Sequence, residues 1–167
     1  MMIHLPAHEY LDKLGISYER ATFPASTEKG AAQVARVLGF RERQMVKTLI
    51  FETDRQERFL VMVGGDQNVV SGNLKKVAGS RNIQLASFEA VKTTTGYEIG
   101  SIPPFSWQPE GFRSFIDVSL MQEPVLGVGT GMWGNEILIS PQDLVRASRA
   151  QIVNLVDKSK PALPDPA

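Results

Sequence analysis

Apolar positions along the chain follow two spacings, one typical of helices and one typical of strands. Helices are predicted over residues 6–14, 31–38, 71–78, 88–93 and from Pro141 onward, and a glycine follows each of the first three. Ser87 and Ser140 are suited as N-caps of the last two helices, and Ser26 or Thr27 as the cap that precedes residue 31.

Strands are predicted over residues 16–20, 46–51, 58–63, 83–85, 115–118, 125–128 and 137–139. The polar residues 54–57 join the second and third of these, which indicates a hairpin. Because residues 58–63 are apolar almost throughout, we expect this strand to be covered on both faces. The sequence therefore predicts an α+β fold with a mixed β-sheet flanked by helices.

The length of 167 residues fits a single domain with one substantial core. Neither an internal repeat nor a linker composition divides the chain, so residues 1–157 are assigned to one domain. Residues 158–167 are rich in proline and lysine and are expected to form a flexible tail.

Lys47 is the most informative charged residue, because it lies in an otherwise apolar strand. Side chains alternate between the faces of a strand, so Lys47 shares one face with Leu49 and Phe51. A lysine among apolar neighbours needs a partner, a pocket or a path for its stem to water. The pattern alone leaves two interpretations open: a lysine that reaches solvent, and a cation presented to an anionic or carbonyl-bearing ligand.

Composition narrows the classes of function. Lysine plus arginine equals aspartate plus glutamate at 18 each, so a general nucleic-acid-binding surface is not expected. Lys75 and Lys76 on a predicted helix, with Arg81 nearby, nevertheless form a local basic group. The absence of cysteine excludes a disulfide framework, a thiolate metal site and a thiol nucleophile. We find no signal peptide and no membrane-spanning apolar segment, and expect a cytoplasmic protein.

Two glycine-containing segments are candidates for ligand binding. The segment from Thr95 to Pro104 combines glycines with a stiff Pro103-Pro104 pair, and four glycines lie between residues 127 and 134. Either segment could hold backbone amides against a ligand or simply form a tight turn.

Three other kinds of site find little support in the sequence. The Lys47-Thr48 pair lacks the glycine-rich loop of a phosphate-binding motif. A serine hydrolase site is equally unsupported, because no Gly-x-Ser-x-Gly turn is present. His4, His8 and Asp12 have a helical spacing, but an exposed polar helix face explains them better than a metal site.

In order along the chain, four blocks resemble the YbaK/EbsC family, the editing domains associated with prolyl-tRNA synthetase. The blocks are residues 27–39, the Val46-Lys47-Thr48-Leu49 strand, residues 95–104 and residues 131–144. The Lys-Thr-Leu strand and the Gly-Tyr-x-x-Gly loop carry most of the likeness, which spans roughly residues 8–156.

This resemblance implies a partly barrel-like sheet of the YbaK type and hydrolysis of the ester of mischarged aminoacyl-tRNA, with substrates like Cys-tRNA(Pro) or Ala-tRNA(Pro). It implies a catalytic role for Lys47, which matches the family's recurrent lysine. The implied substrate-binding residues match the family's loops or adjoin the lysine: Thr48, Gly100, Ser101, Ile102, Pro103, Pro104, Thr130 and Gly131. Ser101 and Thr130 replace glycines of many relatives, and Thr48 replaces an asparagine of relatives specific for alanyl-tRNA.

Asp117 completes the candidate set, because a carboxylate in an apolar strand needs a partner. That partner is Lys47, the substrate ammonium or a structural hydrogen-bond donor, and the sequence does not choose among them. The expected partners of the chain are the acceptor end of mischarged tRNA and, where delivery requires it, an aminoacyl-tRNA synthetase, with no cofactor, membrane or DNA. The alternative function is a non-catalytic module that binds aminoacyl-tRNA or a nucleotide.

Overall fold

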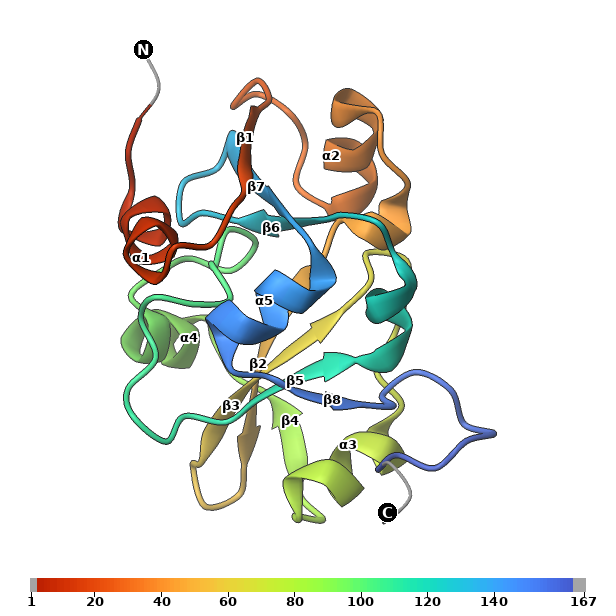
Figure 1. The fold of residues 1–167 in the computed structure, drawn as a ribbon. Helices are drawn as coiled ribbons and strands as arrows, with labels where there is room; N and C mark the ends of the chain where they lie inside the picture. Colours follow the sequence, from red (N-terminus) through yellow and green to blue (C-terminus); the bar gives the residue numbers. More distant parts are fainter. Residues whose placement is uncertain (1–2, 164–167) are drawn as a thin grey trace.

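The computed structural model describes residues 3–163 and contains two β-sheets (Figure 1). The larger sheet has five strands in the order β4–β2–β3–β5–β8. Its strands are β2 (Lys47–Thr53), β3 (Arg58–Val63), β4 (Ile83–Leu85), β5 (Ser114–Asp117) and β8 (Gln151–Val153). β2 pairs antiparallel with β3 and β4, whereas β5 pairs parallel with β3 and β8, so the predicted mixed sheet and hairpin are confirmed.

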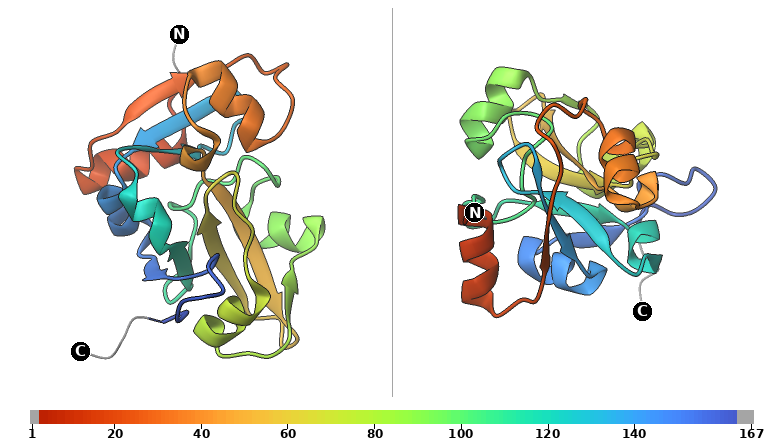
Figure 2. Two further views of the ribbon diagram at one scale, coloured as in Figure 1. Left: turned by 90° about the vertical axis from the view of Figure 1, so that its right-hand side faces the viewer. Right: turned by 90° about the horizontal axis from the view of Figure 1, so that it is seen from above.

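The smaller sheet has the order β1–β7–β6 and is antiparallel throughout. Its strands are β1 (Glu19–Thr22), β6 (Leu126–Gly129) and β7 (Asn135–Ile139). A single parallel bridge between Met45 and Gly127 links this sheet to the residues that lead into β2. Figure 2 shows the two sheets stacked one above the other, with the Lys47 end of β2 directed toward the smaller sheet.

Within residues 3–163, five α-helices surround the sheets. They are α1 (Pro6–Leu14), α2 (Ala31–Leu38), α3 (Ser71–Ala78), α4 (Phe88–Thr95) and α5 (Pro141–Ser148). Ser87 and Ser140 accept the backbone N–H three residues on, as their N-cap assignments predicted. Two short 3₁₀-helices, Glu42–Gln44 and Val118–Gln122, were not predicted, because a single turn leaves little periodicity in a sequence.

The core lies on both faces of β3. Leu60 and Met62 pack into the cluster shared with α1, α5 and the smaller sheet, whereas Phe59 and Val61 pack into the cluster beneath α3. The two-sided cover predicted for residues 58–63 is therefore confirmed. β2 divides in the same way, since Ile50 joins the first cluster while Leu49 and Phe51 pack against the second.

The structure departs from the sequence-based boundaries in a few places. The predicted strand at residues 16–20 is observed at Glu19–Thr22, and Gly30 caps α2 in place of Ser26 or Thr27. Residues 158–163 of the predicted tail contact the domain, because Ala162 is buried and its carbonyl accepts the N–H of Asn154. The remainder of that predicted tail lies outside the described residues.

Candidate functional site

A small cavity of about 180 Å³ opens at the first residues of β2, between α2, the 95–104 loop and the ends of β6 and β7. Four of the predicted site residues line it: Lys47, Thr48, Gly100 and Ile102. They come from two segments about a third of the chain apart, so the fold brings the strand and the glycine loop of the sequence prediction to one place.

Lys47 is half-buried on the face of β2 that it shares with Leu49 and Phe51. Its Nζ donates a hydrogen bond to the carbonyl oxygen of Gln67. Asp66, the carboxylate next to Gln67, is paired with Arg43 Nε at 2.5 Å, and this hydrogen bond lowers the pKa of Asp66. Within residues 3–163 Lys47 forms no ion pair, so its charge remains available to a ligand.

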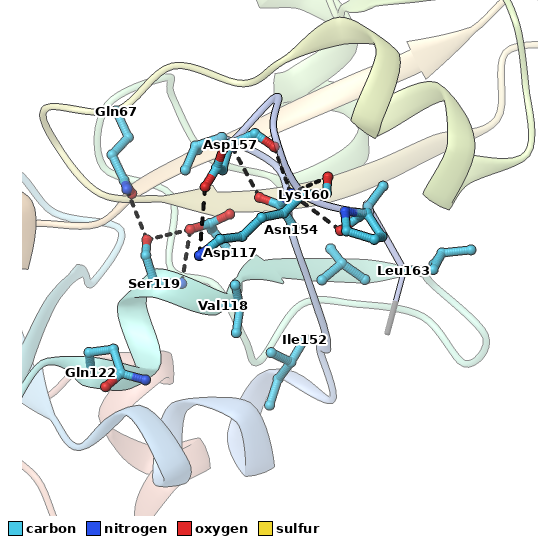
Figure 3. Close-up of a pocket in the computed structure, with 14 residues that line it drawn as sticks. Gln67, Asp117, Val118, Ser119, Gln122, Ile152, Asn154, Asp157, Lys160 and Leu163 are labelled. Atoms are coloured by element: carbon cyan, nitrogen blue, oxygen red, sulfur yellow. Dashed lines mark hydrogen bonds and ion pairs between the residues drawn. The ribbon is translucent and has the colours of Figure 1, made fainter. Parts of the chain in front are cut away.

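A chain of hydrogen bonds holds the side chain of Gln67, the residue whose backbone carbonyl accepts Lys47 (Figure 3). Gln67 Oε1 accepts the N–H of Gly64 at 2.8 Å, and its Nε2 donates to Ser119 Oγ at 2.8 Å. Ser119 Oγ donates in turn to Asp117 Oδ2. Because the Ser119 hydroxyl gives its hydrogen to Asp117, it accepts from the Gln67 amide, and this sets the direction of the bonds up to Gln67.

Asp117 itself is fully buried and does not line the Lys47 cavity. Its Oδ1 accepts the N–H of Leu155 at 2.7 Å, and its Oδ2 accepts the N–H of Ser119 at 3.0 Å. The structure thus shows the hydrogen-bonding role that the sequence left open. Direct contact between Asp117 and substrate stays a prediction to which this geometry lends no support.

Gly129 and Gly131 of the later glycine segment pack against the 95–104 loop. A Cβ on Gly129 would lie 2.9 Å from the Ser101 carbonyl oxygen, and one on Gly131 would lie 2.3 Å from the Tyr97 ring. The N–H of Gly131 donates to the same Ser101 carbonyl at 2.7 Å. Close backbone approach explains why residues without side chains stand at these positions.

Five predicted binding residues do not line the cavity: Ser101, Pro103, Pro104, Thr130 and Gly131. The carbonyls of Pro103 and Pro104 accept Trp107 Nε1 at 2.6 Å and Gln108 Nε2 at 2.8 Å. Thr130 is buried, and its hydroxyl donates to the carbonyl oxygens of a tight turn. Their binding of substrate remains a prediction, and the contacts seen here are structural.

Glu136, at the second position of β7, lines the same cavity and was not predicted. Its Oε2 and the Met45 thioether occupy the space left by Gly127, where a Cβ would meet them at 3.1 Å and 2.6–2.8 Å. Desolvation in this apolar corner raises the pKa of Glu136 to about 8. The signal that could have revealed it is the one that revealed Lys47, a charge beside apolar strand residues, but residue 136 fell just outside the predicted strand.

Thr48 points to the opposite face of β2 from Lys47 and borders both the 180 Å³ cavity and a neighbouring one. Its Oγ1 is buried and forms no hydrogen bond with any residue from 3 to 163. A buried hydroxyl without a partner is costly unless a ligand satisfies it. The cavity thus combines a cation and a protonatable carboxyl in a largely apolar lining, next to the buried hydroxyl of Thr48, which is unpaired within residues 3–163.

Comparison with known families assigns this two-sheet α+β fold, with its lysine and glycine loop, to a class of protein. The model for the aminoacyl-tRNA editing domain matches residues 25–147. The chain belongs to this family, the one that the sequence blocks resemble.

Relatives within the family are distant. The chain is 22% identical to a candidate Cys-tRNA(Pro)/Cys-tRNA(Cys) deacylase, EbsC, of Enterococcus faecalis, over 86% of this chain and 87% of that protein. It is 35% identical to the proline–tRNA ligase of Bacillus cytotoxicus over 46% of this chain, which is only 13% of the ligase. The crystal structure of a candidate trans-editing enzyme for prolyl-tRNA synthetase has the same fold, with a TM-score of 0.83 at 24% identity over 93% of this chain and 99% of that one.

No helix in the described part of the chain is long and apolar enough to cross a membrane.

Proposed function

We propose that this chain is a free-standing trans-editing deacylase that hydrolyses the ester of mischarged aminoacyl-tRNA, with substrates like Cys-tRNA(Pro) or Ala-tRNA(Pro). The observation that carries the proposal is the meeting of Lys47 and Gly100 at one small cavity. The family assignment and the likeness to EbsC support it.

The proposed chemistry needs only modest help from the protein, because an aminoacyl ester is already activated. An ammonium group has three N–H donors, and Lys47 gives one to the Gln67 carbonyl, which leaves two for the ester carbonyl or a nearby phosphate. Water adds to the ester carbon, and the ammonium stabilises the oxyanion that forms. The ester bond then breaks as the proton lost by the water passes to the departing ribose oxygen, which releases the amino acid and the ribose hydroxyl. No histidine or cysteine nucleophile enters this scheme.

Glu136 adds a second group to the proposed chemistry. With a pKa of about 8 its carboxyl is mainly protonated at neutral pH, so it can donate a hydrogen bond to the substrate. A protonated Glu136 carries no negative charge to pair with the substrate ammonium. Contact of Glu136 with the substrate carbonyl or a substrate hydroxyl is therefore favoured.

The size of the cavity supports a small amino acid as the group removed. At about 180 Å³ it is well below the roughly 300–1,000 Å³ typical of pockets for drug-sized ligands. Alanine or cysteine side chains suit this volume better than large aromatic ones.

A deacylation assay tests the proposal directly. Purified protein is incubated with tRNA(Pro) charged with alanine, cysteine or proline, and the loss of each ester is followed with time. We expect faster loss of the alanyl or cysteinyl ester than in buffer, and little loss of the prolyl ester. Binding of charged tRNA without hydrolysis of any of them would favour the non-catalytic module, and repeating the assay with added prolyl-tRNA synthetase tests whether that partner is needed.

A further inference from the structure

A group of exposed apolar side chains lies beside the candidate site, at the β4 edge of the five-stranded sheet. Phe88, the first residue of α4, is 78% exposed, Leu85 at the end of β4 is 59% exposed, and Ile99 is 44% exposed. We name these three residues the Phe88 ledge. Large exposed apolar groups that gather in one place mark binding surfaces more often than isolated ones do.

The ledge borders a cavity of about 510 Å³ that adjoins the Lys47 cavity. Four residues line both cavities: Thr48, Leu49, Ile99 and Ile102. A ligand whose reactive end lies beside Lys47 therefore has the ledge cavity directly next to it, across these four shared residues.

The lining of this second cavity is almost wholly apolar. No charged side chain of the described residues contributes to it, and its two hydroxyls belong to Thr48 and Ser87. Ser87 Oγ is occupied, because it accepts the N–H of Ala90 at 3.1 Å, whereas Thr48 Oγ1 has no partner within residues 3–163. The site suits the apolar faces of a flat ring.

We propose that the Phe88 ledge binds the nucleobase of the terminal nucleotide that carries the ester. The inference rests on the proposed function, and its argument is the short covalent tether: the ester is formed on the ribose, so the base attached to the same ribose must lie next to the reactive cavity. An exposed aromatic ring is the usual platform for a single-stranded base, since stacking does not depend on base identity.

The cavity on the other face of β2 is less suited to the base. It measures about 400 Å³ and is lined in part by the Lys47, Asn68 and Ser71 side chains, which are polar. Its aromatic residue, Phe51, is only partly exposed and stacks on Phe59 with ring centroids 6.3 Å apart. Ribose or phosphate fits this polar side, and the base fits the ledge.

Kinetics on Phe88→Ala test the ledge in a protein that deacylates tRNA. We expect the KM for the charged tRNA to rise about tenfold with kcat nearly unchanged, and Phe88→Trp to restore it, because tryptophan keeps the stacking surface. Val118→Ala is the matched control, since Val118 is 45% exposed but lines a different cavity. An unchanged KM in Phe88→Ala overturns the proposal.

Direct titration separates this inference from the proposed function. Adenosine 5′-monophosphate and ribose 5-phosphate are titrated into the wild type and Phe88→Ala, and amide chemical shifts are followed by NMR. Binding of the nucleotide but not the sugar phosphate, lost in the variant, supports the ledge even if no ester is hydrolysed. Equal binding by both ligands, or an effect of Phe88→Ala seen only with a synthetase present, overturns it and assigns the surface to another role.

Discussion

The cavity beside Asp117 and the cavity beside Lys47 differ in what their polar groups are free to do. The first, about 960 Å³, lies between β5, the 3₁₀-helix that follows it and the C-terminal segment (Figure 3), and Asp117 lies in its wall. There the Asp117 carboxylate accepts hydrogen bonds from the Ser119 hydroxyl and the Leu155 N–H. The Asn154 side chain donates to the carbonyl oxygen of Asp157. Around Lys47 the cavity is about five times smaller, yet Lys47 keeps donors to spare, and Thr48 Oγ1 has no partner among residues 3–163.

The comparison indicates that unmet hydrogen-bonding capacity locates the candidate site better than cavity size. A buried charge whose bonds are all made within the fold stabilises that fold and has nothing left for a substrate. Asp117 and Lys47 were both selected from the sequence as charges in apolar strands. The two are joined through Ser119 and Gln67, but only the lysine faces a cavity with free capacity.

The first prediction removes the free charge. Lys47→Ala should lower the rate of ester hydrolysis about 100-fold, because the oxyanion loses its only cationic donor, while thermal unfolding changes little. Lys75→Ala, on the basic helix α3, is the control and should hydrolyse the ester normally. Unchanged hydrolysis in a folded Lys47→Ala protein would remove the lysine from the mechanism.

A second change tests the wall of the small cavity. Gly131→Ala should destabilise the fold by about 2 kcal/mol or more, because Gly131 has a φ of 96° and its Cβ would enter the Tyr97 ring. Denaturant unfolding measures the loss. Gly72→Ala is the matched control, because a Cβ there meets nothing within 4 Å, and a similar loss in both variants would contradict the packing argument.

The third prediction concerns pH. The pKa of Glu136 is raised to about 8 in the folded protein from an ordinary value of 4.5, so the folded state binds more protons than the unfolded state between these limits. The contribution of Glu136 to the free energy of unfolding is therefore complete below about pH 4.5 and is lost as the pH rises through 8. The slope of this loss is at most about 1.4 kcal/mol per pH unit. Unfolding free energies from pH 5 to 9 should fall more steeply for the wild type than for Glu136→Gln, and parallel curves would refute the assignment.

The smallest expected effect comes from the hydrogen-bond chain that joins the two regions. Ser119→Ala should destabilise the fold by about 1 kcal/mol and lower kcat severalfold with little change in KM, because the Gln67 carbonyl is less firmly held beside Lys47. Ser119→Thr should restore both values. Ser114→Ala is the control, since its buried hydroxyl forms no hydrogen bond within residues 3–163. A loss of stability with unchanged kcat would show that these hydrogen bonds stabilise the fold and have no effect on hydrolysis.

Much of the fold follows from local patterns in the sequence. Periodicity, glycine stops and serine caps located all five α-helices, and apolar runs located seven of the eight strands of the described chain, some with shifted boundaries. The missed strand, β8, has three residues and is defined by its parallel pairing with β5, which no local pattern records. Its existence depends on tertiary contacts.

The candidate site divides in the same way. The sequence by itself singled out Lys47 and the two glycine segments, because a charge in an apolar strand and clustered glycines are unusual wherever they occur. Only the tertiary structure decided which residues face the cavity: it added Glu136, placed Thr48 and Ile102 in the lining, and turned Asp117 toward Ser119 and Leu155. The physical reason is that a residue's identity shows that it needs a partner, whereas the packing of distant segments determines which partner it finds and which groups are left for a substrate.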